Sequence, residues 1–351
     1  MRNMKKKLAV LFGGKSTEYE VSLQSAHAVL EHINKEKYEV IPIGISREGA
    51  WYHFKGEYEK ISENHWICDE KNLTPVVVSE NPAVKGFLEL EEDRYRVLKT
   101  DLVFPVLHGK NGEDGTVQGL FELAGIPVVG CGTLSSAICM DKERAHILAR
   151  AAGISVPKSV AFQKFEKERA ISRVNQELKY PLFVKPVKAG SSFGITKIYE
   201  SKDLPAAVDQ AFCHDDEVIV EENIEGFEVG CAILGKESLT VGRVDEIELS
   251  GGFFDYDEKY TLKSSKIHMP ARIDDETEDR IKKAAVKIYK ALGCSGFARV
   301  DLFLTPSGEI VFNEVNTIPG FTSHSRYPNM MKGIGLSFEQ MLDQLLGLYD
   351  E

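Results

Sequence analysis

The sequence predicts an α/β protein, and three features near its start support this fold class. An apolar strand over residues 7–12 stops at Gly13-Gly14, a helix with apolar residues at helical spacing follows over about 21–33, and a second strand spans 38–45. A strand, a glycine turn, a helix and a strand in this order begin a parallel sheet that helices cover. The N-terminal part is therefore expected to be a parallel α/β domain.

The later elements follow from similar patterns. A strand over 101–106 ends in the loop 108–115, whose three glycines in eight residues predict close packing and a functional role. A helix is expected over about 116–124, and the stretch 130–156 is largely helical around Met140-Asp141-Lys142. Further strands are expected over 181–184, 195–198, 218–221, 228–234, 240–247, 296–303 and 309–313, and long helices over 275–292 and 337–349.

The bulk composition excludes some classes of function. The formal charge of −11, from 43 basic and 54 acidic residues, argues against a nucleic-acid binder, although local lysines and a metal still permit phosphate substrates. We expect no membrane span, because no uncharged apolar run approaches about 20 residues. The basic N-terminus precedes an apolar run, 8–12, that is too short for a signal peptide, so a cytoplasmic location is expected. The six cysteines lack CxxC spacing and are predicted to be reduced core residues.

A hairpin near the C-terminus carries the clearest chemistry. Asp301, Glu314 and Asn316 lie on two strand-like runs joined by the turn residues 305–308. Alternation along adjacent strands predicts that these three side chains share one face, with Arg299 beside them. Oxygen ligands of this kind suit Mg²⁺, which takes substrate phosphates as further ligands. The alternative is a solvated strand face.

Candidate phosphate ligands are dispersed along the chain. The sequence has neither a GxxxxGK[ST] loop nor a GxGxxG turn, so P-loop and nicotinamide-binding enzymes are disfavoured. Lys185 ends a strand just before the glycine-serine loop 190–194, where loop N–H groups can hold a polyphosphate. A lysine at a strand end is usually only solvated, but Lys142, Lys259 and the hairpin strengthen the prediction.

These motifs together resemble the ATP-grasp fold and, within it, the D-alanine-D-alanine ligase family. The resemblance covers nearly the whole chain. It implies an N-terminal α/β domain over 1–130, a central ATP-grasp subdomain over 131–224, and a C-terminal ATP-grasp subdomain over 225–351. The matching motifs are Glu20-Val21-Ser22-Leu23-Gln24-Ser25, the loop 108–115, Val184-Lys185-Pro186, Gly190-Ser191-Ser192-Phe193-Gly194, Ala298-Arg299-Val300-Asp301, Asn313-Glu314-Val315-Asn316-Thr317 and Pro319-Gly320-Phe321-Thr322.

The resemblance implies a ligase that uses ATP and two Mg²⁺ ions, which Mn²⁺ can replace. The first D-alanine carboxylate attacks the γ-phosphate, and the amine of the second amino acid then attacks the resulting acyl phosphate. Such chemistry consists mainly of positioning and charge neutralisation. The family is commonly dimeric, so a homodimer is expected.

The roles that the resemblance implies cover both substrates. The metal ligands would be Asp301, Glu314 and Asn316. The nucleotide would be held by Lys142, Lys185, Ser192 and Lys259 at the phosphates, by Glu221, Glu222, Asn223 and Ile224 at adenine, and by Glu228 at the ribose. Arg299 and the Gly320 N–H would stabilise the oxyanion, Glu20 would bind the first ammonium, and Ser191 and Tyr260 would link to Glu20.

Glu20 and one further residue, His108, have simpler alternatives to the roles that the resemblance implies. His108 would lie near the second amino acid and the phosphates, or would only hydrogen-bond its own loop. Glu20 would also complement the dipole of the helix that begins near it.

The second substrate is predicted from the lid and from one arginine. Tyr260 lies in the expected lid 251–260. The resemblance implies an amine nucleophile, because relatives that make D-alanyl-D-lactate lack this tyrosine. At Arg326, next to Ser325, ordinary D-alanine-D-alanine ligases have an apolar residue. With Asp245 and Phe254, Arg326 resembles the D-serine-selecting pattern of the vancomycin-resistance ligases, and most of all their G-type. D-serine is therefore expected as the second substrate and the product as a peptidoglycan precursor dipeptide, with D-alanine as the alternative.

Other classes fit the residues less well. Another ATP-grasp ligase or carboxylase would share Lys185, Asp301 and Glu314 but would not need the Glu20 motif or Tyr260. An inactive relative that only binds ATP should have lost at least one of four residues, and the chain has them all: Lys185, Arg299, Glu314 and Asn316. An oxidoreductase lacks a dinucleotide fingerprint.

Overall fold

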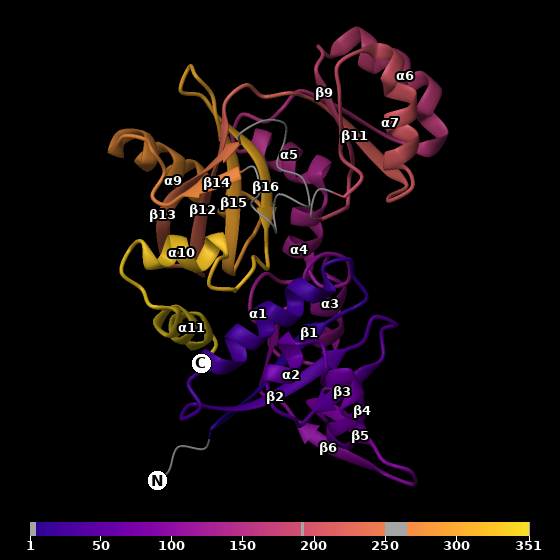
Figure 1. The fold of residues 1–351 in the computed structure, drawn as a ribbon, viewed down its shortest axis with the longest axis vertical. Helices are drawn as coiled ribbons and strands as arrows, with labels where there is room; N and C mark the ends of the chain where they lie inside the picture. Colours follow the sequence, from indigo (N-terminus) through magenta and orange to yellow (C-terminus); the bar gives the residue numbers. More distant parts are fainter. Residues whose placement is uncertain (1–4, 191–192, 250–264, 351) are drawn as a thin grey trace.

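The structure is a computed structural model that describes residues 5–190, 193–249 and 265–350. Its strands form three sheets, and the α/β fold class predicted from the sequence is confirmed (Figure 1). Some of the predicted site residues lie outside the described residues: Ser191, Ser192, Phe254, Lys259 and Tyr260.

The first sheet has seven strands in the order β6-β5-β4-β3-β2-β1-β7. β1 pairs in parallel with β2 and β7, as the sequence predicts, but β2 to β6 form an antiparallel meander that the sequence analysis missed. Strands β3 to β6 are only 4 to 6 residues long, and β6 is mostly exposed, so they lack a clear apolar pattern. The elements are β1 (Lys6–Gly13), α1 (Tyr19–His32), β2 (Tyr38–Ile45), β3 (Trp51–Phe54), α2 (Glu59–Ser62), β4 (Leu73–Val78), β5 (Gly86–Leu90), β6 (Tyr95–Lys99), β7 (Leu102–Pro105) and α3 (Thr116–Leu123).

The second sheet is small and antiparallel, with the strand order β10-β9-β11-β8. It lies at one end of the molecule with α6 and α7 on it (Figure 1). The elements are β8 (Ser159–Gln163), α6 (Lys167–Glu177), β9 (Leu182–Pro186), β10 (Thr196–Ile198), α7 (Leu204–Ala211) and β11 (Glu217–Glu222).

The third sheet has five antiparallel strands in the order β14-β13-β12-β15-β16. The predicted hairpin is its β15–β16 pair, so that prediction is confirmed. The predicted helical stretch 130–156 is two helices that meet at Asp141 and pack on β16. The elements are α4 (Thr133–Met140), α5 (Lys142–Ala151), β12 (Phe227–Gly235), β13 (Leu239–Leu249), β14 (Ser265–His268), α9 (Asp275–Ala291), β15 (Gly296–Leu304), β16 (Ile310–Asn316), α10 (Arg326–Lys332) and α11 (Phe338–Gly347).

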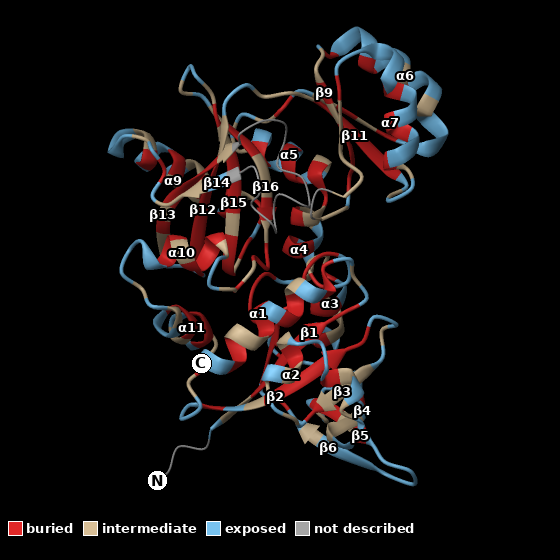
Figure 2. Cartoon of the chain, viewed as in Figure 1, coloured by how far each residue is buried: buried red, intermediate tan, exposed pale blue. Residues whose placement is uncertain are grey.

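One apolar core joins the N-terminal sheet to the C-terminal part of the chain (Figure 2). The ring of Phe104 on β7 lies 5.9 Å from that of Phe297 and 5.7 Å from that of Phe321, centroid to centroid. This contact fixes the segment after β16 against the N-terminal domain. Within the described residues, no helix is long and apolar enough to cross a membrane.

Candidate active site

Two adjoining cavities lie where the three sheets meet. The first, of about 500 Å³, opens between the N-terminal domain and the third sheet, and the second, of about 580 Å³, lies between the second and third sheets. Lys142, Glu228 and Glu314 line both. The two cavities are therefore neighbours that share a charged wall, as a site for a nucleotide beside an amino acid requires.

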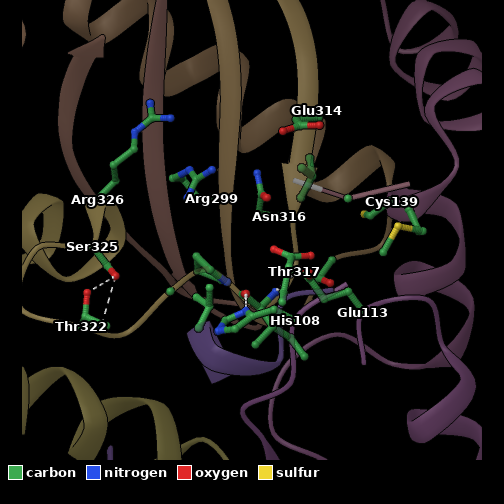
Figure 3. A pocket seen from close by; sticks show the side chains of 18 of the residues that line it. His108, Glu113, Cys139, Arg299, Glu314, Asn316, Thr317, Thr322, Ser325 and Arg326 are labelled. Carbon is green, nitrogen blue, oxygen red and sulfur yellow. Dashed lines mark hydrogen bonds between the residues drawn. The ribbon is translucent and has the colours of Figure 1, made fainter. Parts of the chain in front are cut away.

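The β15–β16 hairpin supplies one wall of the first cavity. Asp301 is paired with Glu314 and Arg299 with Asn316 across the two strands. Arg299, Glu314 and Asn316 line the cavity, and Figure 3 shows all three along one wall, with His108 and Glu113 below them.

Asp301 differs from the sequence expectation, because it does not lie among the cavity-lining residues. It is 1% exposed, and its two oxygens accept from Arg299 at 2.8 and 2.6 Å and from the Asn316 amide at 2.8 Å. A buried carboxylate needs such partners to offset its lost solvation.

The donor set fits a hard divalent cation. Two carboxylates and an amide on adjacent strands offer only oxygen ligands, which Mg²⁺ prefers. Glu314 and Asn316 reach the cavity directly, whereas Asp301 would have to give up part of its bond to Arg299. A bound cation would neutralise phosphate charge beside Arg299.

The second cavity carries the predicted nucleotide residues. Lys185 and Glu221–Ile224 line it, and Lys185 donates to the Glu221 carboxylate at 2.6 Å. Burial would raise the pKa of Glu221, but the Lys185 ammonium holds it below its usual value. Lys142 donates to the carbonyl of Ala189 at 2.8 Å, at the start of the glycine-serine loop. Two cations therefore face a space that β9, β11 and β16 enclose.

Arg326 lies at the first turn of α10 and lines the first cavity. Its guanidinium meets Asp245 fork to fork, with Nε–Oδ2 at 2.8 Å and Nη2–Oδ1 at 2.7 Å, so the predicted partner is found. Its Nη1 donates to Glu228 at 2.8 Å. Glu228, expected at the ribose, thus also belongs to the arginine cluster.

The structure separates two acids at the start of α1. Glu20 lines the cavity rim, but its side chain is 58% exposed and forms an ion pair with Arg47. Glu18, the N-cap residue of α1, is 8% exposed and lies against both glycine loops, because a Cβ at Gly109 would lie 2.5 Å from its Oε2 and one at Gly190 2.9 Å from it. The sequence analysis missed Glu18; the signal was the helix boundary, which turns residues 18 and 20 to different surroundings.

A further acid on the cavity floor was also missed. Glu113 accepts from the N–H of Gly109 at 2.9 Å and from the N–H of Ile318 at 3.0 Å. Burial and the neighbouring Glu18 carboxylate raise the pKa of Glu113 to about 8. His108, beside it, is buried, and burial lowers its pKa. The floor therefore holds two close carboxyl groups that a substrate cation would stabilise.

Comparison with known proteins agrees with this geometry. Family models described as the D-ala D-ala ligase N-terminus and C-terminus match residues 7–131 and 148–347. The chain belongs to the D-alanine-D-alanine ligase family. Its members are ATP-dependent ligases of D-amino acids, and the family implies the use of ATP and Mg²⁺.

Relatives in this family include both resistance and ordinary wall enzymes. The vancomycin C-type resistance protein VanC1 of Enterococcus gallinarum is 45% identical over 99% of each chain. The D-alanine--D-alanine ligase of Caldicellulosiruptor bescii is 44% identical over 98% of this chain and 95% of its own. The solved structure of the VanG D-Ala:D-Ser ligase from Enterococcus faecalis has 72% identity and a TM-score of 0.94, covering 99% of this chain and 100% of its own. This family resemblance is the one predicted from the sequence motifs.

Proposed function

We propose that this ligase joins D-alanine to D-serine through a D-alanyl phosphate and so makes a peptidoglycan precursor dipeptide linked to vancomycin resistance. The observation that carries the proposal is Arg326, held by Asp245 on the wall of the first cavity. The 72% identity to a protein named as a D-Ala:D-Ser ligase supports it.

A charged wall favours a hydroxyl over a methyl group. The Arg326 guanidinium and the neighbouring Ser325 hydroxyl, which line the same cavity, offer polar partners. A site built to bond a hydroxyl rejects an analogue that lacks it, since its polar groups would lose their partner. D-serine satisfies such a wall and D-alanine does not. Phe254, outside the described residues, stays a predicted member of this subsite.

The two cavities divide the substrates between them. In the proposal the nucleotide occupies the second cavity, with its phosphates at Lys142 and Lys185 and its adenine against the backbone of 221–224. Glu228, which lines both cavities, is the residue proposed to reach the ribose. Glu314 and Asn316 would hold Mg²⁺, which would neutralise charge on the phosphates. Ser192 and Lys259 remain predicted phosphate ligands.

The first D-alanine binds in the first cavity with its ammonium near Glu18, a role we move from the exposed Glu20 to the buried acid beside it. Its carboxylate attacks the γ-phosphate of ATP, and ADP leaves. The amine of D-serine, after losing a proton, attacks the acyl phosphate. Arg299 and the Gly320 N–H stabilise the oxyanion, and phosphate leaves. Ser191 and Tyr260 remain predicted to close the site.

Phosphate release from purified protein, ATP and Mg²⁺ tests the proposal. D-alanine alone should give slow release, and adding D-serine should accelerate it and yield the mixed dipeptide by mass. Fast release and D-alanyl-D-alanine from D-alanine alone would support the alternative, an ordinary wall ligase. The second metal ion, replacement by Mn²⁺, the homodimer and the cytoplasmic location stay predictions from the family resemblance.

A further inference from the structure

The turn after β16 is held by side chains from the N-terminal domain. Ile318 donates its N–H to Glu113 at 3.0 Å, and its carbonyl lies 2.9 Å from Nδ1 of His108. The N–H of Phe321 donates to the hydroxyl of Ser25, on α1, at 3.2 Å. Gly320, between them, lines the cavity. Both ends of the turn are therefore fixed from the opposite domain.

The hydrogen bonds through Ser25 form one directed chain. A carbonyl can only accept, so His108 must carry its proton on Nδ1 and donate to Ile318. Burial lowers the pKa of His108, which favours the neutral ring, and in that ring Nε2 is an acceptor. The Ser25 hydroxyl, 3.1 Å from Nε2, then donates to His108 and accepts from Phe321. Ser25 thus uses its single proton for the histidine and its oxygen for the turn.

The turn has little freedom to compensate for a loss of these hydrogen bonds through Ser25. A Cβ on Gly320 would lie 2.7 Å from the Ser325 Oγ, so the turn is packed directly against the segment that carries the second-substrate wall. The Ser325 hydroxyl accepts from the N–H of Thr322 at 3.0 Å and shares a hydrogen bond with the Thr322 hydroxyl at 2.8 Å (Figure 3). A displacement of Phe321 would therefore move Gly320 relative to Arg299 and to Ser325 together.

We propose that Ser25 is a positioning residue for the attack of the amine on the acyl phosphate. From the N-terminal domain it sets the place of the Gly320 N–H, and it does so through Phe321 and His108 rather than by contact with substrate. The inference rests on the proposed function, because it takes Gly320 as the oxyanion donor. The first step, phosphorylation of the D-alanine carboxylate, creates no oxyanion at the carbonyl and so should depend on Ser25 far less.

α1 offers a matched control one turn earlier. Ser22 is also fully buried, and its hydroxyl accepts from the N–H of Gly13 at 2.8 Å and donates to the carbonyl of Val106 at 2.5 Å. Both of its partners lie in the N-terminal domain. Ser22→Ala therefore removes an equally buried, doubly bonded serine without touching the turn.

The test separates the two chemical steps. Exchange of ¹⁸O between the bridging and non-bridging positions of the ATP phosphates, with D-alanine and Mg²⁺, reports acyl phosphate formation, and mass analysis reports dipeptide. For Ser25→Ala we expect kcat for dipeptide to fall by about 10- to 100-fold, since small misplacements at a reacting centre cost this much, with exchange and the KM for ATP within about threefold of wild type. Ser22→Ala should stay near wild type in both assays. Ser25→Cys, which keeps the shape but accepts weakly, should fall between, and it serves if Ser25→Ala does not fold.

Each failure points to a different error. If Ser25→Ala lowers exchange and dipeptide formation equally, or behaves like Ser22→Ala, the positioning role is wrong. If the wild-type protein itself shows neither exchange nor dipeptide, the proposed function is wrong, and Ser25 is not the cause.

Discussion

Arg326 and Asp245 meet fork to fork in the interior, Nε to Oδ2 at 2.8 Å and Nη2 to Oδ1 at 2.7 Å. Glu228 and Asp301 approach the same guanidinium at 2.8 and 3.4 Å. Asp245 is 0% exposed, so the Arg326 guanidinium offsets the cost of burying its carboxylate. The cluster joins α10 to β12, β13 and β15, and through Glu228 it connects the second-substrate wall with the nucleotide cavity.

Replacing Arg326 by methionine should shift the preference toward D-alanine. The apolar side chain removes the donors that a hydroxyl would use, and it leaves Asp245 and Glu228 without their buried cation, at a cost of about 3–5 kcal/mol in stability. The ratio of kcat/KM for D-serine to that for D-alanine should fall by about tenfold or more.

This ratio is the right readout because a loss of folded protein cancels in it. Arg243→Met is the control: Arg243 lies two residues from Asp245 and pairs with Glu278 at 2.8 Å, away from both cavities. An unchanged ratio in Arg326→Met would remove this residue from the account of specificity.

Glu18 and Glu20 should respond differently to loss of charge. Glu18→Gln is expected to raise the KM for the first D-alanine by about tenfold or more, because a buried carboxylate near the ammonium is worth more than an exposed one. Glu20→Gln, at an exposed ion pair with Arg47, should change it less than about threefold. Steady-state kinetics at saturating ATP and D-serine measure both. A larger rise in KM for Glu20→Gln than for Glu18→Gln would show that Glu20 binds the ammonium of the first D-alanine.

Glu314→Gln should lower turnover by orders of magnitude and leave folding intact. The change keeps the shape of the side chain but removes the charge of a ligand that reaches both cavities. Turnover over a range of Mg²⁺ concentrations, with circular dichroism as the folding control, measures the effect. Wild-type turnover at low Mg²⁺ would refute the metal assignment.

Lys185→Met should affect both stability and nucleotide binding. The change removes the ammonium partner of the Glu221 carboxylate, which is 2% exposed, and this costs about 3–5 kcal/mol. It also removes a cation from the second cavity, so the KM for ATP should rise. Lys188→Met is the control, because the Lys188 side chain is 43% exposed and pairs with Asp215 and Glu217, which line neither cavity. Equal urea midpoints for the two variants would contradict the buried pair as described.

Glu113 should make stability depend on pH. Burial first, and the Glu18 carboxylate second, raise its pKa from 4.5 to about 8, against the opposing effects of the Gly109 and Ile318 N–H groups and of Arg299. The folded state therefore keeps a proton that the unfolded state loses, so this contribution is full below about pH 4.5 and is lost as the pH rises to about 8.

Urea unfolding between pH 5 and 8.5 measures this contribution. The wild type should lose stability relative to Glu113→Gln as the pH rises, since glutamine cannot ionise. His108, whose lowered pKa costs stability only as the pH falls below about 6.5, is common to both proteins and cancels in the comparison. Parallel curves would contradict the raised pKa.

The sequence was most informative where pattern and chemistry coincide. β2 was predicted over 38–45 and observed over Tyr38–Ile45, because an apolar strand between turn signals is a local property. The β15–β16 hairpin followed from its turn residues and from two carboxylates at matching positions. Arg326 and Asp245, 81 positions apart, were paired through the family resemblance, since neither residue carries a local sign of the other.

What the sequence could not supply were properties of the assembled molecule. The role of Glu18 depends on where α1 begins and on its contact with Gly190, 172 positions later. Strand alternation predicted that Asp301 lies in the cleft, but both of its oxygens accept hydrogen bonds from Arg299 on the same strand. The bond from Phe321 to Ser25 crosses a domain interface and has no pattern in either segment.

Competition between the two amino acids tests the central claim most directly. The protein would receive ATP, Mg²⁺ and equal concentrations of D-alanine and D-serine near neutral pH, with the two dipeptides separated by mass. We predict that D-alanyl-D-serine dominates in the wild type and that Arg326→Met reverses or abolishes this excess. A wild-type product that is mainly D-alanyl-D-alanine would contradict the account of the Arg326–Asp245 wall and make the chain an ordinary wall ligase.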